Sequence, residues 1–347
     1  MEKILITGAN GFLGSHLVDF CIKEGKKVYG IDLPDRPLQN LNHYTDGKLV
    51  FTFEEKLKVF NTFVQIPTTN ENFVFLECDL ENASLLENII IKINPKYIFH
   101  FGAQPLVLPS WKDPITTIKT NVIGTINIFE PVKKHRLKTR VIVACTSAEY
   151  GTTTSINRPL KETDPLLAIH PYGISKIATE LLARQYYINF GIEIINLRFF
   201  NQTGPRRKGD ATADFISKIA KIELGLSEPI IEVGNLNPYR DFTGIKDSLK
   251  AIWLAAINGK PGETYNVCSG RKIQIRQILN IALSFSSKNI EIRENIPQKL
   301  RKTDEDIILG DNSKIKNELG WEVSIPIEET LKDMFDYWSD FYKKYGI

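Results

Sequence analysis

The chain has 347 residues, 42% of them hydrophobic and 24% charged, and its formal net charge is +3. This length predicts two domains, because a domain usually holds about 100–200 residues. The small charge gives no indication of a nucleic-acid partner, and no apolar run reaches the ~18 residues of a membrane-spanning helix. The N-terminus lacks the layout of a secretory signal, so we expect a cytoplasmic protein.

Strand and helix patterns alternate through the first half of the chain. The strand-like runs are continuously apolar, which is typical of strands buried on both faces of a sheet. This order predicts an α/β fold with a Rossmann-type, doubly wound parallel sheet. The apolar runs lie at residues 3–7, 27–31, 73–77, 97–102 and 140–146, and the best helical patterns at 12–25, 83–94 and 114–135.

A long segment, residues 33–76, interrupts this alternation. We expect an insertion near residues 40–72, with two or three turns of helix around 53–61. A loop of this length without structure is unusual in a compact domain. A surface excursion and a lid over the substrate are the two alternatives for its role.

Beyond about residue 200 the strand and helix patterns are mixed, which predicts a smaller α/β substrate-binding domain. We expect residues 1–200 to form the NAD(P)-binding Rossmann domain and residues 201–347 to form mainly the substrate domain, with the chain crossing back between the two. A last helix is expected from about Pro326. The four cysteines lack metal-ligand spacing, so we expect buried thiols in a reducing compartment and no metal site: Cys21, Cys78, Cys145 and Cys268.

The stretch TGANGFLG follows the first strand and opens the first helix. Gly8 permits a tight turn, Gly11 lets backbone N–H groups approach a phosphate, and Gly14 allows close packing of helix and strand. The N–H groups and the dipole of the helix start favour a pyrophosphate. The stretch therefore predicts a dinucleotide site.

Asp32 ends the second strand, where a carboxylate can accept hydrogen bonds from the adenosine ribose. Asp32 would repel the 2′-phosphate of NADP, so we expect NAD as the cofactor. NADP is the alternative, because Arg36 is close enough in the sequence to pair with that phosphate. Asp79 ends a later strand and is expected near the adenine.

Tyr172 and Lys176 are four residues apart in PYGISK. Pro171 suits the first position of a helix, so both side chains are expected on one helical face. A nearby lysine cation stabilises a phenolate and lowers the tyrosine pKa, which suits proton transfer at neutral pH.

Together these motifs resemble the extended short-chain dehydrogenase/reductases that act on nucleotide sugars. The resemblance also rests on CDL, HFGAQ, TNVIGT, TSAEYG and RFFNQTGP, and it covers nearly the whole chain except roughly residues 40–72. The C-terminal half is most similar to GDP-4-keto-6-deoxy-mannose reductases and GDP-mannose 4,6-dehydratases, through residues 219–247 and 265–270. It implies a GDP-linked sugar as substrate, deoxysugar biosynthesis as the setting, and a homodimer formed through helices around 114–134 and 171–190.

The resemblance also implies roles for individual residues. Thr146 completes a Thr–Tyr–Lys triad and hydrogen-bonds the sugar hydroxyl or ketone. Asn201 is expected at the diphosphate, Arg240 at the diphosphate or its ribose, and Arg301 at the nucleotide. Arginine suits this because its planar fork pairs two phosphate oxygens. The complete set of expected contacts is Gly8, Gly11, Phe12, Leu13, Gly14, Asp32, Asp79, Leu80, Asn121 and Lys176 for the cofactor, Thr146, Tyr172 and Lys176 for catalysis, and Ser147, Asn201, Arg240 and Arg301 for the substrate.

Water elimination needs acid–base groups beside the sugar ring, and the resemblance to dehydratases implies that one of them, a glutamate, stands just after the threonine. Here Ser147 and Ala148 hold those positions, and Glu149, one residue on, would point to the opposite face of a strand. We therefore expect a 4-keto reductase that moves a hydride. A 4,6-dehydratase or a 4-epimerase with internal redox is the alternative, and a dinucleotide-sensing regulator without turnover is a remote third.

Overall fold

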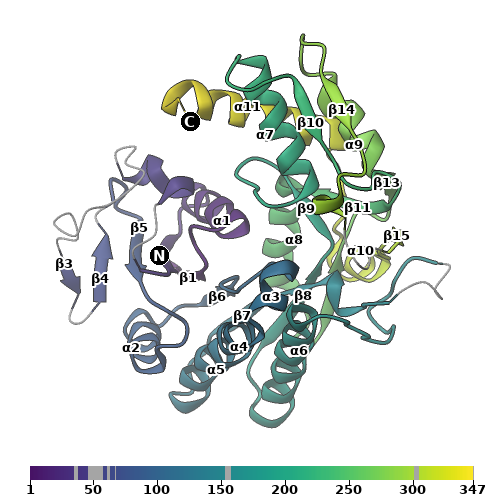
Figure 1. The fold of residues 1–347 in the computed structure, drawn as a ribbon. Helices are drawn as coiled ribbons and strands as arrows, with labels where there is room; N and C mark the ends of the chain where they lie inside the picture. The colour runs from purple at the N-terminus through teal and green to yellow at the C-terminus, as the bar shows by residue number, and fades with distance from the viewer. Residues whose placement is uncertain are drawn as a thin grey trace. The chain divides into compact units, whose positions relative to one another are not determined.

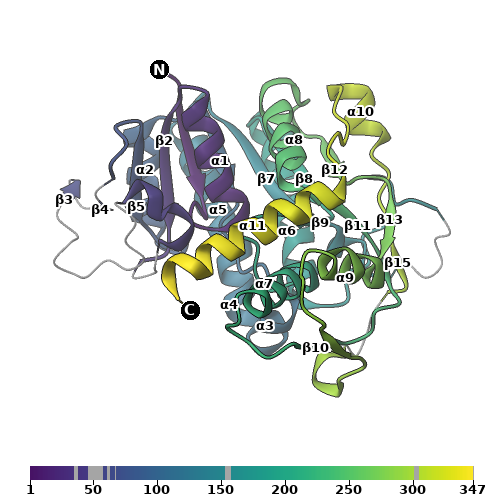
Figure 2. The same cartoon turned by 90° about the horizontal axis from the view of Figure 1, so that it is seen from above.

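The computed structural model describes residues 1–34, 38–45, 58–60, 63–66, 68–152, 158–300 and 305–346 (Figures 1 and 2). The chain divides into two compact units. The first comprises Met1–Gly151, Pro165–Arg198 and Ala251–Tyr265, and the second Thr152–Asp164, Phe199–Lys250 and Asn266–Ile347. None of the helices in these described ranges is both long and apolar enough to cross a lipid bilayer.

The first unit is built on a sheet with the strand order β12-β8-β7-β6-β1-β2-β5-β4-β3. The central pairs β7–β6, β6–β1, β1–β2 and β2–β5 are parallel, which confirms the predicted doubly wound sheet. The strands are β1 (Lys3–Thr7), β2 (Lys27–Asp32), β3 (Lys58–Phe60), β4 (Phe63–Ile66), β5 (Phe73–Glu77), β6 (Tyr97–His100), β7 (Arg140–Thr146), β8 (Ile194–Phe199) and β12 (Thr264–Val267).

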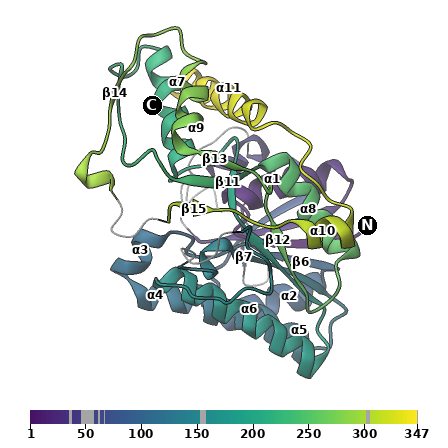
Figure 3. The same ribbon diagram turned by 90° about the vertical axis from the view of Figure 1, so that its right-hand side faces the viewer.

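Consecutive apolar residues in these strands are buried because helices cover the sheet. Ile4, Leu5 and Ile6 in β1 are fully buried, as are all four residues of β6. Figure 3 shows α4, α5 and α6 together against the sheet. The helices of this unit are α1 (Phe12–Lys23), α2 (Ala83–Ile93), α3 (Val107–Lys112), α4 (Pro114–Ile118), α5 (Gly124–Lys134) and α6 (Pro171–Phe190), with short 3₁₀ turns η1 (Gln39–Tyr44) and η4 (Ser147–Glu149).

The helical pattern at residues 114–135 is not one regular helix. Lys119–Ile123 (η3) form a π-helical turn between α4 and α5. Short π turns inside α-helices are frequent at functional sites. Asn121 lies in this turn, and its carbonyl accepts hydrogen bonds from the hydroxyls of Thr125 at 2.6 Å and Thr179 at 3.1 Å.

The insertion extends the sheet instead of leaving it. Strand β4 pairs antiparallel with β5, and β3 pairs antiparallel with β4. The helix predicted around residues 53–61 is therefore wrong at 58–60, where Lys58–Phe60 is a strand. Val59 and Phe60 are residues that favour strands, and pairing with β4 outweighs the helical pattern there. The remainder of that prediction, at residues 53–57 and 61, lies outside the described residues.

The second unit contains a small sheet in which β11 (Tyr239–Gly244) pairs with β13 (Lys272–Gln274), β15 (Ile307–Ile308) and β9 (Asn201–Thr203). Beside it, β10 (Ile230–Glu232) pairs with β14 (Glu291–Arg293). The predicted C-terminal helix is α11, which begins after Pro326 and buries Leu331, Met334 and Trp338. The helices are α7 (Ala211–Glu223), α9 (Ile275–Leu283), α10 (Ser313–Leu319) and α11 (Ile327–Tyr345), with η5 (Pro297–Lys299), and α8 (Ile245–Asn258) runs from this unit into the first.

Candidate active site

The strand order reverses direction at β1. From β1 the chain proceeds outward to β2 and β5, and it then returns to the other side of β1 through β6. Loops that leave β1 and β6 therefore diverge, and such a switch point at the carboxyl ends of parallel strands forms a ligand crevice. The glycine loop after β1 lies at this point.

Two glycines of this loop admit no side chain. Gly8 has φ = 66°, and a Cβ added to it would lie 2.8 Å from the backbone nitrogen of Gly102. A Cβ on Gly14 would lie 2.1 Å from the carbonyl oxygen of Gly8. The tight turn and the close packing expected from the sequence are both present.

The start of α1 is suited to bind an anion. Gly11 is its N-cap, and the first hydrogen bond inside the helix runs from Ser15 N–H to the Gly11 carbonyl at 3.0 Å. Backbone N–H groups before this bond are directed out of the helix end, where the helix dipole adds to their positive potential. Phe12 and Leu13 form this first turn, which has no acidic side chain. The site fits the pyrophosphate of a dinucleotide.

Asp32 lies beside the glycine loop. Its carboxylate accepts hydrogen bonds from the backbone N–H of Asn10 at 2.9 Å and of Leu33 at 2.8 Å. The insertion reaches the same place, since the backbone N–H of Asn40 in η1 donates to the Asn10 side chain at 3.2 Å. Arg36, the residue that favoured NADP in the sequence, lies outside the described residues.

The adjoining strand brings Asp79 and Leu80 to the same edge of the sheet. The Cys78 N–H donates to the Asp32 carbonyl at 2.9 Å, so the two strand ends are adjacent. Asp79 accepts a hydrogen bond from Glu81 N–H, and Leu80 is buried. These positions are compatible with the predicted contacts to the adenosine half of the cofactor.

Asn121, in contrast, has its side chain occupied by the protein. Its amide oxygen accepts from Gln104 N–H at 2.7 Å, and its amide nitrogen donates to the Gln104 carbonyl and to the Ser175 hydroxyl. The side chain joins the π turn to α6. Its predicted contact with the cofactor stays a prediction, while its bracing of α6 is evident.

The stretch that carries Thr146 bends into a 3₁₀ turn, Ser147–Glu149. The Thr146 hydroxyl oxygen accepts from Ala148 N–H at 3.2 Å, and the Glu149 carboxylate accepts from Thr146 N–H at 2.9 Å, which together form a capping box. Because one side of the Thr146 oxygen is occupied, its proton is available to a sugar oxygen. Glu149 is fully buried, so its carboxyl does not face outward with Thr146.

The helix α6 carries Tyr172 and Lys176 and begins against this turn. Pro171 is its first residue, as predicted, and the His170 ring accepts the Gly173 N–H at 2.9 Å as the N-cap. A Cβ on Gly173 would lie 2.8 Å from the Ala148 carbonyl oxygen. The start of α6 and the Thr146 turn are therefore close at the backbone, so the elements that carry the three residues of the predicted triad lie together.

Lys176 is buried, and its ammonium donates to the Ala144 carbonyl at 2.7 Å. Burial lowers the pKa of Lys176 from its ordinary value. The bond to Ala144 fixes the ammonium at the end of β7, from which Thr146 also projects. At this position the positive charge of Lys176 can stabilise the phenolate form of Tyr172, which is four residues earlier on the same helix.

Two residues near this site were missed or left without a role by the sequence. His170 could have been identified as the N-cap, because it precedes a proline at the first helical position. His100 is buried between the hydroxyls of Thr7 and Thr125, at 2.9 Å from each. Burial, aided by the Lys176 charge, lowers its pKa to about 3, so it is a neutral structural group.

The remaining predicted contacts lie in the second unit. Asn201 in β9 donates to the Asp241 carbonyl at 3.1 Å, and Arg240 in β11 is buried and donates to the carbonyls of Tyr239 and Glu305. Neighbouring strands carry the two residues, since Asn201 pairs with Phe242. Arg301 lies outside the described residues.

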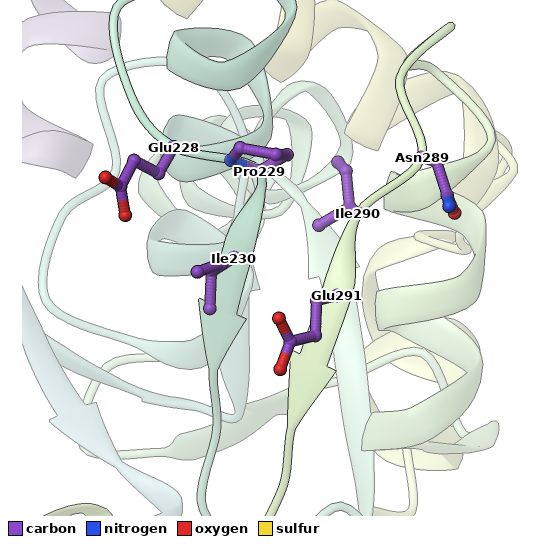
Figure 4. A pocket seen from close by; sticks show the side chains of 6 residues that line it. All are labelled: Glu228, Pro229, Ile230, Asn289, Ile290 and Glu291. Atoms are coloured by element: carbon purple, nitrogen blue, oxygen red, sulfur yellow. The ribbon is translucent and has the colours of Figure 1, made fainter.

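A surface depression of about 620 Å³ also lies in the second unit, along β10 and β14. Its lining includes the carboxylates of Glu228 and Glu291 but no cationic side chain (Figure 4). The Glu291 carboxylate is paired with Arg293 at 2.7 Å, and the described lining offers no cationic group that could hold a diphosphate. We therefore assign no role in the reaction to this depression.

A family model described as GDP-mannose 4,6 dehydratase matches residues 5–334. The chain belongs to this family. It is 28% identical to a GDP-mannose 4,6-dehydratase of Yersinia enterocolitica, over 96% of this chain and 93% of the relative. It is 27% identical to a GDP-6-deoxy-D-mannose reductase of Pseudomonas aeruginosa, over 70% of this chain and 80% of the relative. A solved UDP-glucuronic acid 4-epimerase of Bacillus cereus, in complex with UDP-glucuronic acid and NAD, is similar with a TM-score of 0.80 and 26% identity, over 98% of this chain and 100% of that one.

These findings confirm the predicted membership of the extended short-chain dehydrogenase/reductases and an enzyme of the nucleotide-sugar-modifying type. The similar Bacillus cereus structure holds NAD, which agrees with the predicted class of cofactor, NAD(P). The choice between NAD and NADP and the roles of the single residues stay predictions, and the first of these can be tested directly.

We expect NAD(H) to bind more tightly than NADP(H), because Asp32 would repel a 2′-phosphate at the ribose. Asp32→Ala should narrow this difference in dissociation constant, measured by calorimetry. Asp79→Ala is the matched control, since it removes a carboxylate from the adjacent strand end and should leave the ratio unchanged. Tighter binding of NADP(H) by the wild type would contradict the assignment.

Proposed function

We propose that this protein reduces a nucleotide-linked 4-keto sugar, with a GDP-sugar as the first candidate substrate. The observation that carries the proposal is the Thr146 turn. Its half-buried positions are Ser147 and Ala148, and its one carboxyl group, on Glu149, is fully buried and bonded to the Thr146 backbone. The turn offers a hydroxyl donor for a C4 oxygen and lacks the acid that water elimination requires.

The residues of the first unit can then be given distinct roles. The bound dinucleotide supplies a hydride for C4 of the sugar. Thr146 donates a hydrogen bond to the C4 oxygen, and Tyr172 delivers the proton that converts this oxygen to a hydroxyl. Lys176, fixed on the Ala144 carbonyl, stabilises the tyrosinate that remains. In the second unit, Asn201 and Arg240 are the proposed contacts to the diphosphate, a role that suits the planar guanidinium.

A 4-epimerase is the second candidate, and Asp32 favours it. A carboxylate that selects NAD suits enzymes that keep their cofactor and reoxidise it within each turnover. The similar Bacillus cereus structure is an epimerase with NAD. An epimerase would interconvert two nucleotide sugars without net consumption of NADH, whereas a reductase consumes it in proportion to product.

The first prediction from this proposal concerns Tyr172. Tyr172→Phe should lower turnover by about 10²–10⁴-fold, the usual contribution of a positioned acid–base group. The dissociation constant for NADH should be nearly unchanged, since the phenol oxygen is not part of the glycine-loop site. The assay is NADH oxidation with a GDP-linked 4-keto sugar, and Tyr187→Phe, a half-exposed tyrosine near the end of α6, is the control. Turnover close to wild type in the Tyr172 variant would exclude the role.

A second prediction separates reduction from dehydration. Incubation of the protein with GDP-mannose and NAD should give no product that has lost water, as judged by mass spectrometry. Elimination needs a base at C5 and an acid at C6, each contributing about 10²–10⁴-fold, and the Thr146 turn supplies neither. Ala148→Glu should introduce slow elimination, and Ala148→Gln, which has the same size without the acid, should not. Catalytic loss of water by the wild type would refute the reductase assignment.

We further propose that the protein is a cytoplasmic homodimer that associates through α4 and α6. Its four cysteines are free and buried, as expected for a reducing compartment, which cell fractionation can test. On α6, Ile174, Leu181 and Ile188 recur every seven residues and are 50%, 56% and 57% exposed. Ile115 of α4, which packs beside α6, is 67% exposed. A second copy of the same surface would cover such an apolar stripe.

Sedimentation equilibrium should therefore show a dimer for the wild type. Leu181→Glu should shift the protein to monomer, because it places a charge in the middle of the stripe. Leu226→Glu, at a similarly exposed leucine outside α4 and α6, should remain dimeric. A monomeric wild type, or a dimer unaffected by the Leu181 change, would contradict this surface.

A further inference from the structure

A group of ionisable side chains is buried behind the Thr146 turn, within the first unit. Arg198 of β8 donates to both carboxylate oxygens of Glu180 in α6, at 2.8 Å from Nε and 2.5 Å from Nη2. Its third nitrogen donates to the Tyr150 hydroxyl at 2.9 Å. Glu149 lies against this pair, and none of these side chains has more than marginal contact with solvent.

The two oxygens of Glu149 are in different situations. Oε1 accepts the Thr146 N–H. Oε2 is buried and has no hydrogen-bond donor within the part of the chain that the structure describes. The nearest cationic nitrogen, Arg198 Nε, is 3.5 Å away, and its hydrogen already goes to Glu180. As an ionised group, Glu149 would thus place a buried, unsatisfied charge beside another carboxylate.

A proton on Glu149 resolves this conflict. An Oε2–H group becomes a donor, and the neighbouring Glu180 carboxylate, one oxygen of which lies within 4.8 Å of an oxygen of Glu149, is the available acceptor. Burial raises the pKa of Glu149 well above its ordinary value, and the Glu180 charge raises it further against the opposing effect of Arg198. One guanidinium then balances one carboxylate, and the second carboxyl is neutral.

The other groups that face Glu149 agree with this assignment. Cys145, on β7, is buried, and burial raises the pKa of its thiol, so it adds no charge. Lys176 on α6 is the nearest additional cation, but its ammonium is bonded to the Ala144 carbonyl. Cys145, Glu149 and Glu180 are close enough together to suggest a metal site, yet Arg198 already supplies the positive charge to Glu180.

We propose that Glu149 is a positioning residue that fixes the Thr146 turn through the Thr146 N–H, and that it does so as a neutral acid hydrogen-bonded to Glu180. The capping box extends this effect to the Thr146 side chain, because in the same turn the Ala148 N–H donates to the Thr146 hydroxyl oxygen. The neutral state has a second consequence. The positive charge of Lys176 is not cancelled by a carboxylate behind it and acts on Tyr172. The catalytic part of this proposal rests on the proposed reductase function.

Two substitutions at one position test the positioning role. Glu149→Gln keeps an acceptor for the Thr146 N–H and supplies a neutral donor toward Glu180, so kcat should stay within about twofold of wild type. Glu149→Leu removes both bonds at similar volume and should lower kcat by up to about 10²-fold, the cost of misplacing a reacting group by about 1 Å. The dissociation constant for NADH should be the same in all three proteins. Equal kcat values for the two variants would overturn the positioning role.

The pH dependence of kcat tests the neutral state. If Glu149 is neutral, Glu149→Gln removes no charge, and the profile should superimpose on that of wild type. If Glu149 is ionised, the substitution removes a negative charge near Lys176, and the profile should shift. A shifted profile would overturn the assignment of the proton to Glu149.

Two further measurements need no substrate. Glu180→Gln breaks the charged pair with Arg198 and should lower the melting temperature, whereas Glu149→Gln should leave it nearly unchanged. Hydrogen exchange at the Thr146 amide should be slow in wild type and Glu149→Gln and fast in Glu149→Leu. If these results hold but the wild type reduces no 4-keto sugar, the proposed function fails and the hydrogen-bonding role of Glu149 stands. An equal loss of stability in the two glutamine variants, or fast exchange in the wild type, would overturn that role.

Discussion

The close approach of two backbones, at Gly8 and Gly102, is the constraint on which the catalytic unit depends. A Cβ on Gly8 would lie 2.8 Å from Gly102 N, and the Gly102 N–H donates to the Thr7 hydroxyl at 2.9 Å. The loops that leave β1 and β6 touch here before they diverge in opposite directions. These two strand ends can come so close because both loops have glycine at the contact. The loops part at a switch point of the strand order, where parallel sheets of this kind bind their ligands.

From this contact a hydrogen-bonded chain leads to the catalytic helix. The Thr7 hydroxyl, which accepts from Gly102, donates to His100, and His100 in turn donates to the Thr125 hydroxyl, which donates to the Asn121 carbonyl. The carbonyl end sets these directions. Thr125 gives its only proton to the Asn121 carbonyl and so accepts from His100 Nε2–H, which leaves Nδ1 of the neutral ring to accept from Thr7. The Asn121 side chain then reaches Ser175 on α6. The cofactor loop and the helix that carries Tyr172 are thus held by one polar network, which a protonated His100 would disrupt.

The sequence predicted those parts of the site whose geometry is local. The glycine spacing, a carboxylate at the end of β2, and a proline one residue before Tyr172 each determine a backbone conformation within a few residues. What failed or was missed depends on partners distant in the chain. Residues 58–60 are a strand because β4 and β5 offer a sheet edge. The Asn121 side chain is occupied because α6 presents Ser175 to it, and no pattern near Asn121 indicates this.

Glu149, on which the proposed function depends most, is also positioned by partners that are distant in the chain. Sequence alternation assigned its direction on the premise of a continuing strand, while the chain in fact turns after Thr146. The Glu149 carboxyl still lies inside the protein, but for a different reason. Arg198, about 50 residues further on, is already paired with Glu180. A second carboxyl group beside this pair is therefore favoured only in its protonated form. Under the proposed function, a turn with its acid drawn inward keeps the Thr146 hydroxyl as a donor to the sugar and has no carboxyl group placed for the elimination of water. The proposed chemistry then depends on which of the buried groups behind the turn carries the charge.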